Sequence, residues 1–184
     1  MKYRFAPASV LAALAIASAT PALHAQTRNF TINVAAGAAI PTGDLGNITN
    51  VGYNLTGGIG LKSHSSPLGF RAEGFFNEFG FSDNVSNSDI GKFRIAGVNG
   101  NLTYDLPLSA VGAGNTLYAI GGVGYYNVKD TGVDASDSDI GWNLGAGFRF
   151  PLTGFSAYVE ARYHGVSNSL VDAHFIPIVF GIVF

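Results

Sequence analysis

Two segments near the C-terminal end alternate strictly between apolar and polar side chains. In Ile140–Phe150 the even-numbered positions are all apolar, whereas the odd-numbered positions hold only Gly, Asn and Arg. Thr153–His164 repeats the pattern, with Glu160 and Arg162 on the polar side. Successive side chains of a β-strand point to opposite faces of the sheet. The alternation therefore predicts strands that separate an apolar medium from a polar one.

Six further segments follow this pattern less strictly. The predicted strands are Phe30–Ile40, Val51–Leu61, Gly69–Asn77, Lys92–Leu106, Thr116–Val128, Ile140–Phe150, Thr153–His164 and Ala173–Phe184. Phe93 and Ile95 stand at odd-numbered positions, whereas the apolar residues at the end of the same segment stand at even-numbered ones. This wrong parity predicts a bulge or an inward-facing pair. The parity of Thr116–Val128 is ambiguous. The 25 glycines, 14 Phe and 8 Tyr also suit a curved, twisted sheet.

The connections between these strands alternate in length. Long polar links are expected at Thr42–Asn50, Ser82–Gly91, Lys129–Asp139 and Val166–Asp172, and shorter ones at Ser63–Leu68, Pro107–Asn115 and Pro151–Gly154. Transmembrane barrels have long outer loops and short periplasmic turns. We therefore predict an all-β fold, an eight-stranded antiparallel transmembrane β-barrel with an up-and-down meander.

A soluble β-sandwich or lipocalin-like barrel is the alternative, because it has the same periodicity with the apolar face buried. The Gly-rich, charged polar face favours the membrane barrel, since it suits a narrow interior. Aromatic residues at predicted strand ends also resemble the girdles of membrane barrels: Phe79, Phe81, Tyr104, Tyr125, Tyr126, Phe150 and Tyr163.

The N-terminal segment has the pattern of a cleaved signal peptide. Lys2 and Arg4 precede an apolar run, Val10–Ala19, and small residues end at Ala25. The run is shorter than the ~20 residues of a spanning helix; a permanent anchor is the alternative. We expect a signal peptide at 1–25 and a barrel domain at 26–184. Removing 25 of 184 residues leaves 159, in which eight basic residues stand against twelve acidic ones, a net charge of −4.

The C-terminal run resembles the assembly signal of outer-membrane proteins, with Ile178, Phe180, Ile182 and Phe184 at alternate positions. Ala39–Gly46 and Tyr104–Leu108 also resemble recurrent pieces of the small outer membrane β-barrel domain family (OmpA/OmpX-like, eight-stranded). Val179 and Val183 depart from it, because an inward polar residue is commoner there. The resemblance implies the outer membrane of a Gram-negative-type bacterium. It implies contact with outer-membrane lipid and lipopolysaccharide, with periplasmic chaperones and the barrel-assembly machinery during biogenesis, and a monomeric state.

Six charged residues fall on the predicted inner face: Arg71, Glu73, Asp105, Arg149, Glu160 and Arg162. Unpaired buried charges are very costly, so these groups must pair. An eight-stranded barrel has an interior just wide enough for side chains. We therefore expect a structural salt-bridge network in a filled lumen, with a polar path for ions as the alternative.

The expected function is non-enzymatic, with structural or surface-interaction roles for acidic outer loops, and with no cofactor, catalytic residue or metal site. One alternative is an OmpW-like narrow conduit for small or hydrophobic solutes, which the apolar inner positions Phe75, Val179 and Val183 motivate. Another is a lipid A deacylase-like enzyme. That family carries His-x-Ser-Asn, whereas His164 here is followed by Ser167 and Asn168, one residue too far.

Charge and composition bear on two further kinds of partner. The acidic residues Asp130, Asp134, Asp137 and Asp139 could bind a hard cation through oxygen ligands, although their spacing does not match an EF-hand. No basic tract is present, so nucleic acid is not an expected partner. The absence of Cys excludes a disulfide framework.

Overall fold

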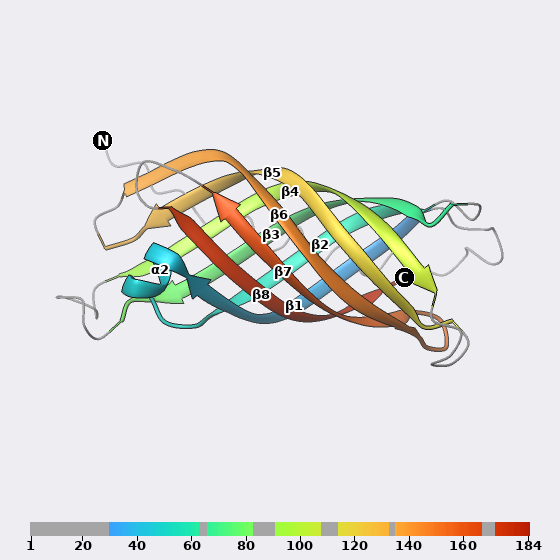
Figure 1. Cartoon of the computed structure of the whole chain (residues 1–184). Coiled ribbons are helices and arrows are strands. Elements are labelled where there is room, and N and C mark those ends of the chain that lie inside the picture. Colours follow the sequence, from blue (N-terminus) through green and yellow to red (C-terminus); the bar gives the residue numbers. More distant parts are fainter. Residues whose placement is uncertain (1–29, 63–65, 83–90, 108–113, 133–134, 167–171) are drawn as a thin grey trace, which may run out of the picture.

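The chain forms a closed barrel in which every strand pairs antiparallel with its neighbours in sequence and β8 closes onto β1 (Figure 1). The computed structural model describes residues 30–62, 66–82, 91–107, 114–132, 135–166 and 172–184. The elements are β1 (Phe30–Thr42), α2 (Gly43–Ile48), β2 (Gly52–Lys62), β3 (Leu68–Gly80), β4 (Lys92–Pro107), β5 (Thr116–Asp130), β6 (Ala135–Pro151), β7 (Ser156–Val166) and β8 (Ala173–Val183). The predicted eight-stranded up-and-down barrel is confirmed. Among the described residues, no helix is long and apolar enough to cross a membrane.

The two faces of the sheet differ as the alternation predicted. Large apolar side chains such as Val98, Leu144 and Ile140 are exposed on the outward face. The inward face instead carries glycines, amides and charged groups, which are buried in the lumen. This arrangement is the inverse of a soluble protein, because the apolar surface lies outside and needs an apolar medium.

The doubtful parity of β4 is resolved without a bulge. Its register runs unbroken from Phe93 opposite Phe79 to Tyr104 opposite Leu68. Phe93 and Ile95 are buried inside the barrel, so the inward-facing pair was the correct alternative. In β5 the inward residues are Tyr118, Ile120, Tyr126 and Val128.

Two predictions about the strand ends were wrong. Phe79 and Tyr126 do not belong to an outer aromatic girdle, because both are fully buried in the lumen. The segment Lys129–Asp139 is not a long loop either. The β5–β6 ladder continues to Asp130 opposite Ala135, because polar residues pair as strands beyond the membrane as readily as apolar ones pair within it.

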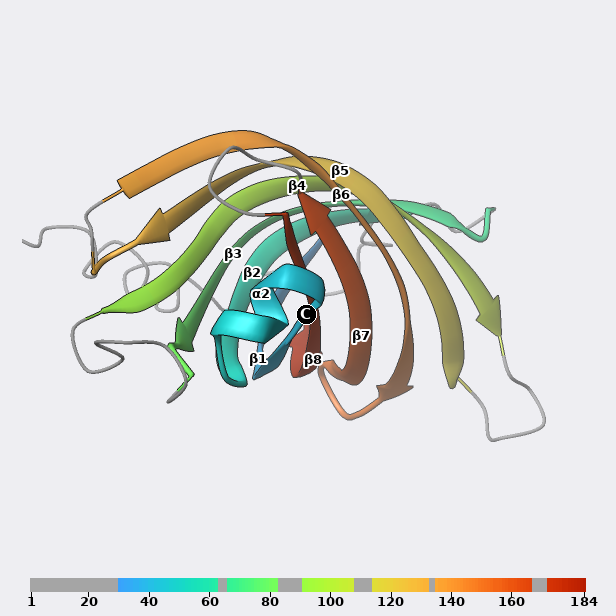
Figure 2. The ribbon, with the colours of Figure 1, turned by 60° about the vertical axis from the view of Figure 1, so that its left-hand side comes forward.

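The first connection holds a short helix where the sequence predicted a loop. Gly43 begins α2 with a φ of 58°, a left-handed conformation that suits glycine. The helix lies at the barrel opening beside β1 and β8 (Figure 2), and its Leu45 side chain is fully buried. We call this end, where the predicted long loops lie, the outer end, and the opposite end the inner end.

Candidate functional site

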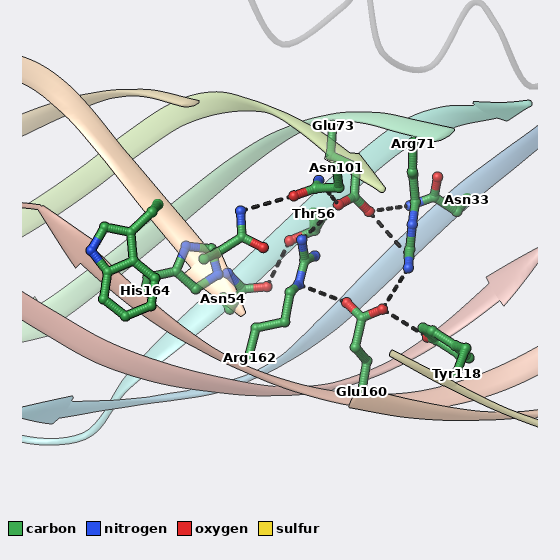
Figure 3. Close-up of polar contacts among 12 residues, drawn as sticks. Asn33, Asn54, Thr56, Arg71, Glu73, Asn101, Tyr118, Glu160, Arg162 and His164 are labelled. Carbon is green, nitrogen blue, oxygen red and sulfur yellow. Dashed lines mark hydrogen bonds and ion pairs between the residues drawn. The ribbon is translucent and has the colours of Figure 1, made fainter. Parts of the chain in front are cut away.

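The centre of the lumen contains a closed ring of two arginines and two glutamates (Figure 3). Arg71 reaches Oε2 of Glu160 at 2.7 Å and Oε1 of Glu73 at 3.3 Å. Arg162 reaches Oε2 of Glu73 and Oε1 of Glu160, both at 2.8 Å. Each carboxylate therefore lies between two guanidinium groups, and the ring as a whole is neutral.

Neutral polar groups complete the coordination of the two carboxylates. Asn33 and Asn101 donate to Glu73 at 2.9 and 3.1 Å, and the Tyr118 hydroxyl donates to Glu160 at 2.7 Å. Asn143 in turn donates to Asn101 at 2.8 Å. The ring and its partners come from six different strands, β1, β3, β4, β5, β6 and β7, so they tie the wall together across the interior.

Aromatic rings and glycines hold Arg71 in place. Its guanidinium lies 5.5 Å from the ring centroid of Tyr118 and 5.8 Å from that of Tyr158. These rings pack against Gly147 and Gly181, where an added Cβ would come within 2.3 and 2.4 Å of the ring atoms. The glycines are required because the narrow interior leaves no room for a side chain opposite each ring.

The inner mouth of the barrel has a second ion-pair group. Asp105 is bound by Lys62 and by Arg149, the latter at 3.1 Å. A cavity of about 330 Å³ lies here, lined by these two cations together with Arg71 and Tyr118. It is bounded toward the centre by the ring, so polar side chains separate the mouth from the rest of the lumen.

The interior becomes apolar between the ring and the outer end. Asn54, Thr56 and Asn77 form a layer of hydrogen bonds, and a cavity of only about 10 Å³ lies beside it. Beyond it is a cluster that we call the outer apolar cluster: Ala39, Leu45, Phe75, Phe79, Phe93, Ile95, Tyr126, Val128, Val166, Ala173 and Phe175. Leu45 brings α2 into this cluster and closes it at the outer end.

The structure brings the six predicted lumen charges into two groups, four in the ring and Asp105 with Arg149 at the mouth. The sequence reasoning missed Lys62, Tyr118 and the outer apolar cluster. The signal for Lys62 was its even parity in β2, shared with the buried residues Asn54 and Thr56. The signal for the cluster was the misplaced parity of Phe93 and Ile95.

The C-terminal residues lie as the strand pattern requires. Ile178, Phe180 and Phe184 are exposed on the outward face and Ile182 is half-buried. The backbone of Phe184 exchanges two hydrogen bonds with Ile32, at 2.9 and 3.1 Å, which helps to close β8 against β1. Val179 is buried in the lumen, and Val183 lines the inner cavity.

His164 faces the lumen and is almost fully buried. Its Nδ1 lies 2.9 Å from the Tyr126 hydroxyl, and its ring stacks on Phe175 with centroids 4.8 Å apart. Ser167 and Asn168 lie outside the described residues. The barrel wall therefore lies between the His164 side chain and a lipid outside the barrel.

The acidic residues of the β5–β6 hairpin bind backbone groups. The carboxylates of Asp130, Asp137 and Asp139 accept hydrogen bonds from backbone N–H groups at 2.7 to 2.8 Å, and Asp134 lies outside the described residues. Within the described part of the chain no three His, Cys, Asp or Glu side chains gather as metal ligands do. The predicted signal peptide, 1–25, also lies outside the described residues.

Comparisons with known proteins agree with the fold. A family model for the outer membrane protein beta-barrel domain matches residues 9–184. The structure is similar to Neisserial surface protein A, with a TM-score of 0.67 and 15% identity over 85% of this chain and 96% of that one. It is also similar to OprG from Pseudomonas aeruginosa (TM-score 0.54, 12% identity, 84% and 95% covered). It is similar as well to a major outer membrane protein from Thermus thermophilus, with a TM-score of 0.52 and 13% identity over 85% of this chain and 99% of that one. No curated protein matches the sequence.

Proposed function

The chain belongs to the outer membrane protein beta-barrel domain family, and from that premise we propose that it is a closed, non-enzymatic barrel rather than a channel. As a member of this family, it lies in the outer membrane. Its work is done by the outer loops and by the wall, and the lumen serves to hold the barrel rigid.

One observation carries this proposal, the filling of the lumen from the inner mouth cavity to the outer end. From the inner mouth outward, the lumen contains the Asp105 ion pairs, the Arg–Glu ring, the amide layer and the outer apolar cluster. Between the ring and the cluster the cavity is about 10 Å³, close to the volume needed for a single water molecule. An ion would have to break a neutral, fully paired ring and then cross a desolvated apolar layer, and both steps are unfavourable.

The two alternative functions gain less support from the same residues. The apolar side chains Phe75 and Val179, which motivated a conduit for hydrophobic solutes, are buried by packing with other lumen groups. The buried, inward position of His164 does not suit catalysis on a lipid ester outside the wall. We therefore keep the closed barrel as the proposal.

Planar-bilayer recording tests the proposal. The purified protein should give no stepwise conductance, while a general porin in the same bilayer shows that the assay detects channels. The variant Phe79→Ala combined with Phe175→Ala removes two touching rings of the cluster but keeps the Arg–Glu ring, so it should stay silent as well. Regular conductance steps from the unmodified protein would overturn the closed-barrel proposal.

A further inference from the structure

The cavity at the inner mouth is large enough for a small molecule. Its volume of about 330 Å³ lies at the lower end of the range of ligand pockets, whereas the cavity on the other side of the Arg–Glu ring is about 10 Å³. Arg71 and Tyr118, which line the larger cavity, lie on the side of the ring that faces away from His164 (Figure 3). The cavity is therefore blind at the ring and opens toward the inner end.

The charged residues that line this cavity are all basic. They are Lys62, Arg71 and Arg149, and none of the described lining residues is acidic. Asp105 is buried beside the cavity, where its Oδ2 accepts hydrogen bonds from Lys62 and Arg149. The Arg–Glu ring already neutralises Arg71. Two cations and one carboxylate thus leave the mouth with a net charge of +1.

Arg149 keeps most of its hydrogen-bonding capacity. Its guanidinium lies 5.0 Å from the ring centroid of Tyr118 and, within the described part of the chain, donates a single hydrogen bond, from Nη1 to Asp105 at 3.1 Å. A guanidinium presents several N–H donors in a planar fork that matches a carboxylate. The Lys62 side chain is 44% exposed. Both cations can therefore donate to an anion in the cavity while Asp105 fixes their positions.

The rim of the cavity is apolar. Leu152, Phe155, Val183 and Phe184 line it, and the rings of Phe155 and Phe184 pack with centroids 6.0 Å apart. Leu152 follows Arg149 by three residues in the sequence. A ligand that binds Arg149 through a charged end would thus place an apolar body against this rim.

The two ends of the barrel differ in the charge of their links. At the inner end, residues 63–67, 108–115 and 152–155 contain no Asp or Glu. The links of the opposite end contain Asp44, Asp83, Asp89, Asp134 and Asp172. Like charges repel, and clefts lined by one sign of charge attract the opposite sign. An anion is therefore favoured at the inner mouth and disfavoured at the outer end.

We propose that the inner mouth binds a small organic carboxylate of single negative charge, which enters from the inner side and does not cross the barrel. Arg149 binds the carboxylate through its planar fork, Lys62 adds a point charge from a flexible stem, and the apolar rim contacts the body of the ligand. A single charge fits because it brings the mouth from +1 to neutrality. A doubly charged anion would leave excess negative charge next to the buried Asp105.

This site goes beyond the closed-barrel function, and the two fail independently. Missing ligand binding would leave the silent barrel intact. Conductance through the lumen would refute the closed barrel without removing the cations at its mouth.

Calorimetric titration of the purified protein in phosphatidylcholine nanodiscs, which leave both ends of the barrel open to water, tests the proposal. The probes are benzoate and its neutral analogue benzamide, which differ in charge but scarcely in shape. Benzoate should bind about tenfold more tightly, the worth of one charge-assisted hydrogen bond. Acetate, which lacks the apolar ring, should bind about tenfold more weakly than benzoate because it buries nothing against the rim.

Two substitutions should move the affinity for benzoate in opposite directions. Arg149→Gln lowers the charge of the mouth to zero and removes the fork, so the dissociation constant should rise about tenfold. Asp105→Asn raises the charge to +2 and releases both cations, so the dissociation constant should fall about fivefold. Partial unfolding could not produce such a gain. Lys92→Gln, the control, removes a cation from the far end of the barrel and should change the affinity less than about twofold, since salt screens that distance.

Lys62→Gln, with a loss of about fivefold, replaces Arg149→Gln if the latter does not give the folded band on an unheated gel. Equal binding of benzoate and benzamide would overturn the proposal. So would a folded Asp105→Asn protein that binds benzoate no more tightly than the unmodified one. Equal binding of acetate and benzoate would overturn the assignment of the ligand to carboxylates with an apolar body.

Discussion

The ion ring makes a specific prediction about coupling between its members. Replacing Arg71 by Met removes the 2.7 Å contact with Glu160 and the 3.3 Å contact with Glu73. Two buried carboxylates then share the single guanidinium of Arg162. Removing one partner of a buried pair costs about 3–5 kcal/mol, because the remaining charge stays buried and uncompensated. Glu160→Gln leaves the opposite excess, two arginines and one carboxylate, and should have a cost of similar size.

The double variant Arg71→Met/Glu160→Gln should be more stable than the sum of the two single changes implies. It keeps the neutral pair between Glu73 and Arg162 at 2.8 Å, and Asn33 and Asn101 still donate to Glu73. The Gln carbonyl can also accept the Tyr118 hydroxyl. We expect a coupling energy of about 2 kcal/mol, within the range of contacting residues in one network.

Urea unfolding in phospholipid vesicles, followed by the fluorescence of the single Trp and by the shift between folded and unfolded gel bands, gives the four free energies. Lys62→Gln is the matched control. It breaks an ion pair whose lysine is 44% exposed and leaves Arg149 on Asp105, so the cost should stay below about 1 kcal/mol. The ring is not a coupled unit if the free-energy changes of the two single variants add up to that of the double variant. The same conclusion follows if each single variant costs no more unfolding free energy than Lys62→Gln.

Other predictions concern the glycines, the helix and the C-terminus. Gly147→Ala should cost about 1–3 kcal/mol in the same unfolding assay by pushing Tyr118 off Arg71, whereas Gly80→Ala, with nothing within 4 Å of its added Cβ, should be neutral. Leu45→Ala should destabilise the outer end by about 2–3 kcal/mol because it empties a fully buried site, and protease should then cut near α2 first. Phe184→Ala should lower the amount of assembled barrel in outer membranes several-fold by weakening the proposed assembly signal. It should cost the refolded protein at most about 3 kcal/mol of unfolding free energy, the transfer free energy of one Phe ring, because about half of this outward ring is exposed to the apolar medium.

Much of the wall could be predicted from sequence because an outer-membrane strand follows a two-residue period. The medium on one side is apolar, so segments such as Ile140–Phe150 reveal both their conformation and their orientation. The period also placed Arg71, Glu73, Glu160 and Arg162 on one face. It could not give their partners, because Arg71 and Glu160 are 89 residues apart and meet only once the barrel is closed.

The apolar part of the lumen was beyond the same reasoning. An inward Phe93 or Phe79 reads as an outward residue with the wrong parity or as part of a girdle, because the pattern assumes a polar interior. Gly43–Ile48 also gave no helical period, since six residues are too few to show one. Its structure depends on Leu45 finding the cluster, which is a tertiary contact.

The most direct test of the filled lumen uses thiol accessibility in a chain that has no native Cys. Thr56→Cys places a thiol in the amide layer, where the native side chain is 8% exposed, and Lys62→Cys places one at the inner mouth. In folded barrels in vesicles, a small, charged thiol reagent should label Cys at position 62 only when it is added from the inner side, and it should leave position 56 unlabelled from either side; both should label in urea. Rapid labelling of position 56 in the folded protein would show a water-filled path and contradict the account.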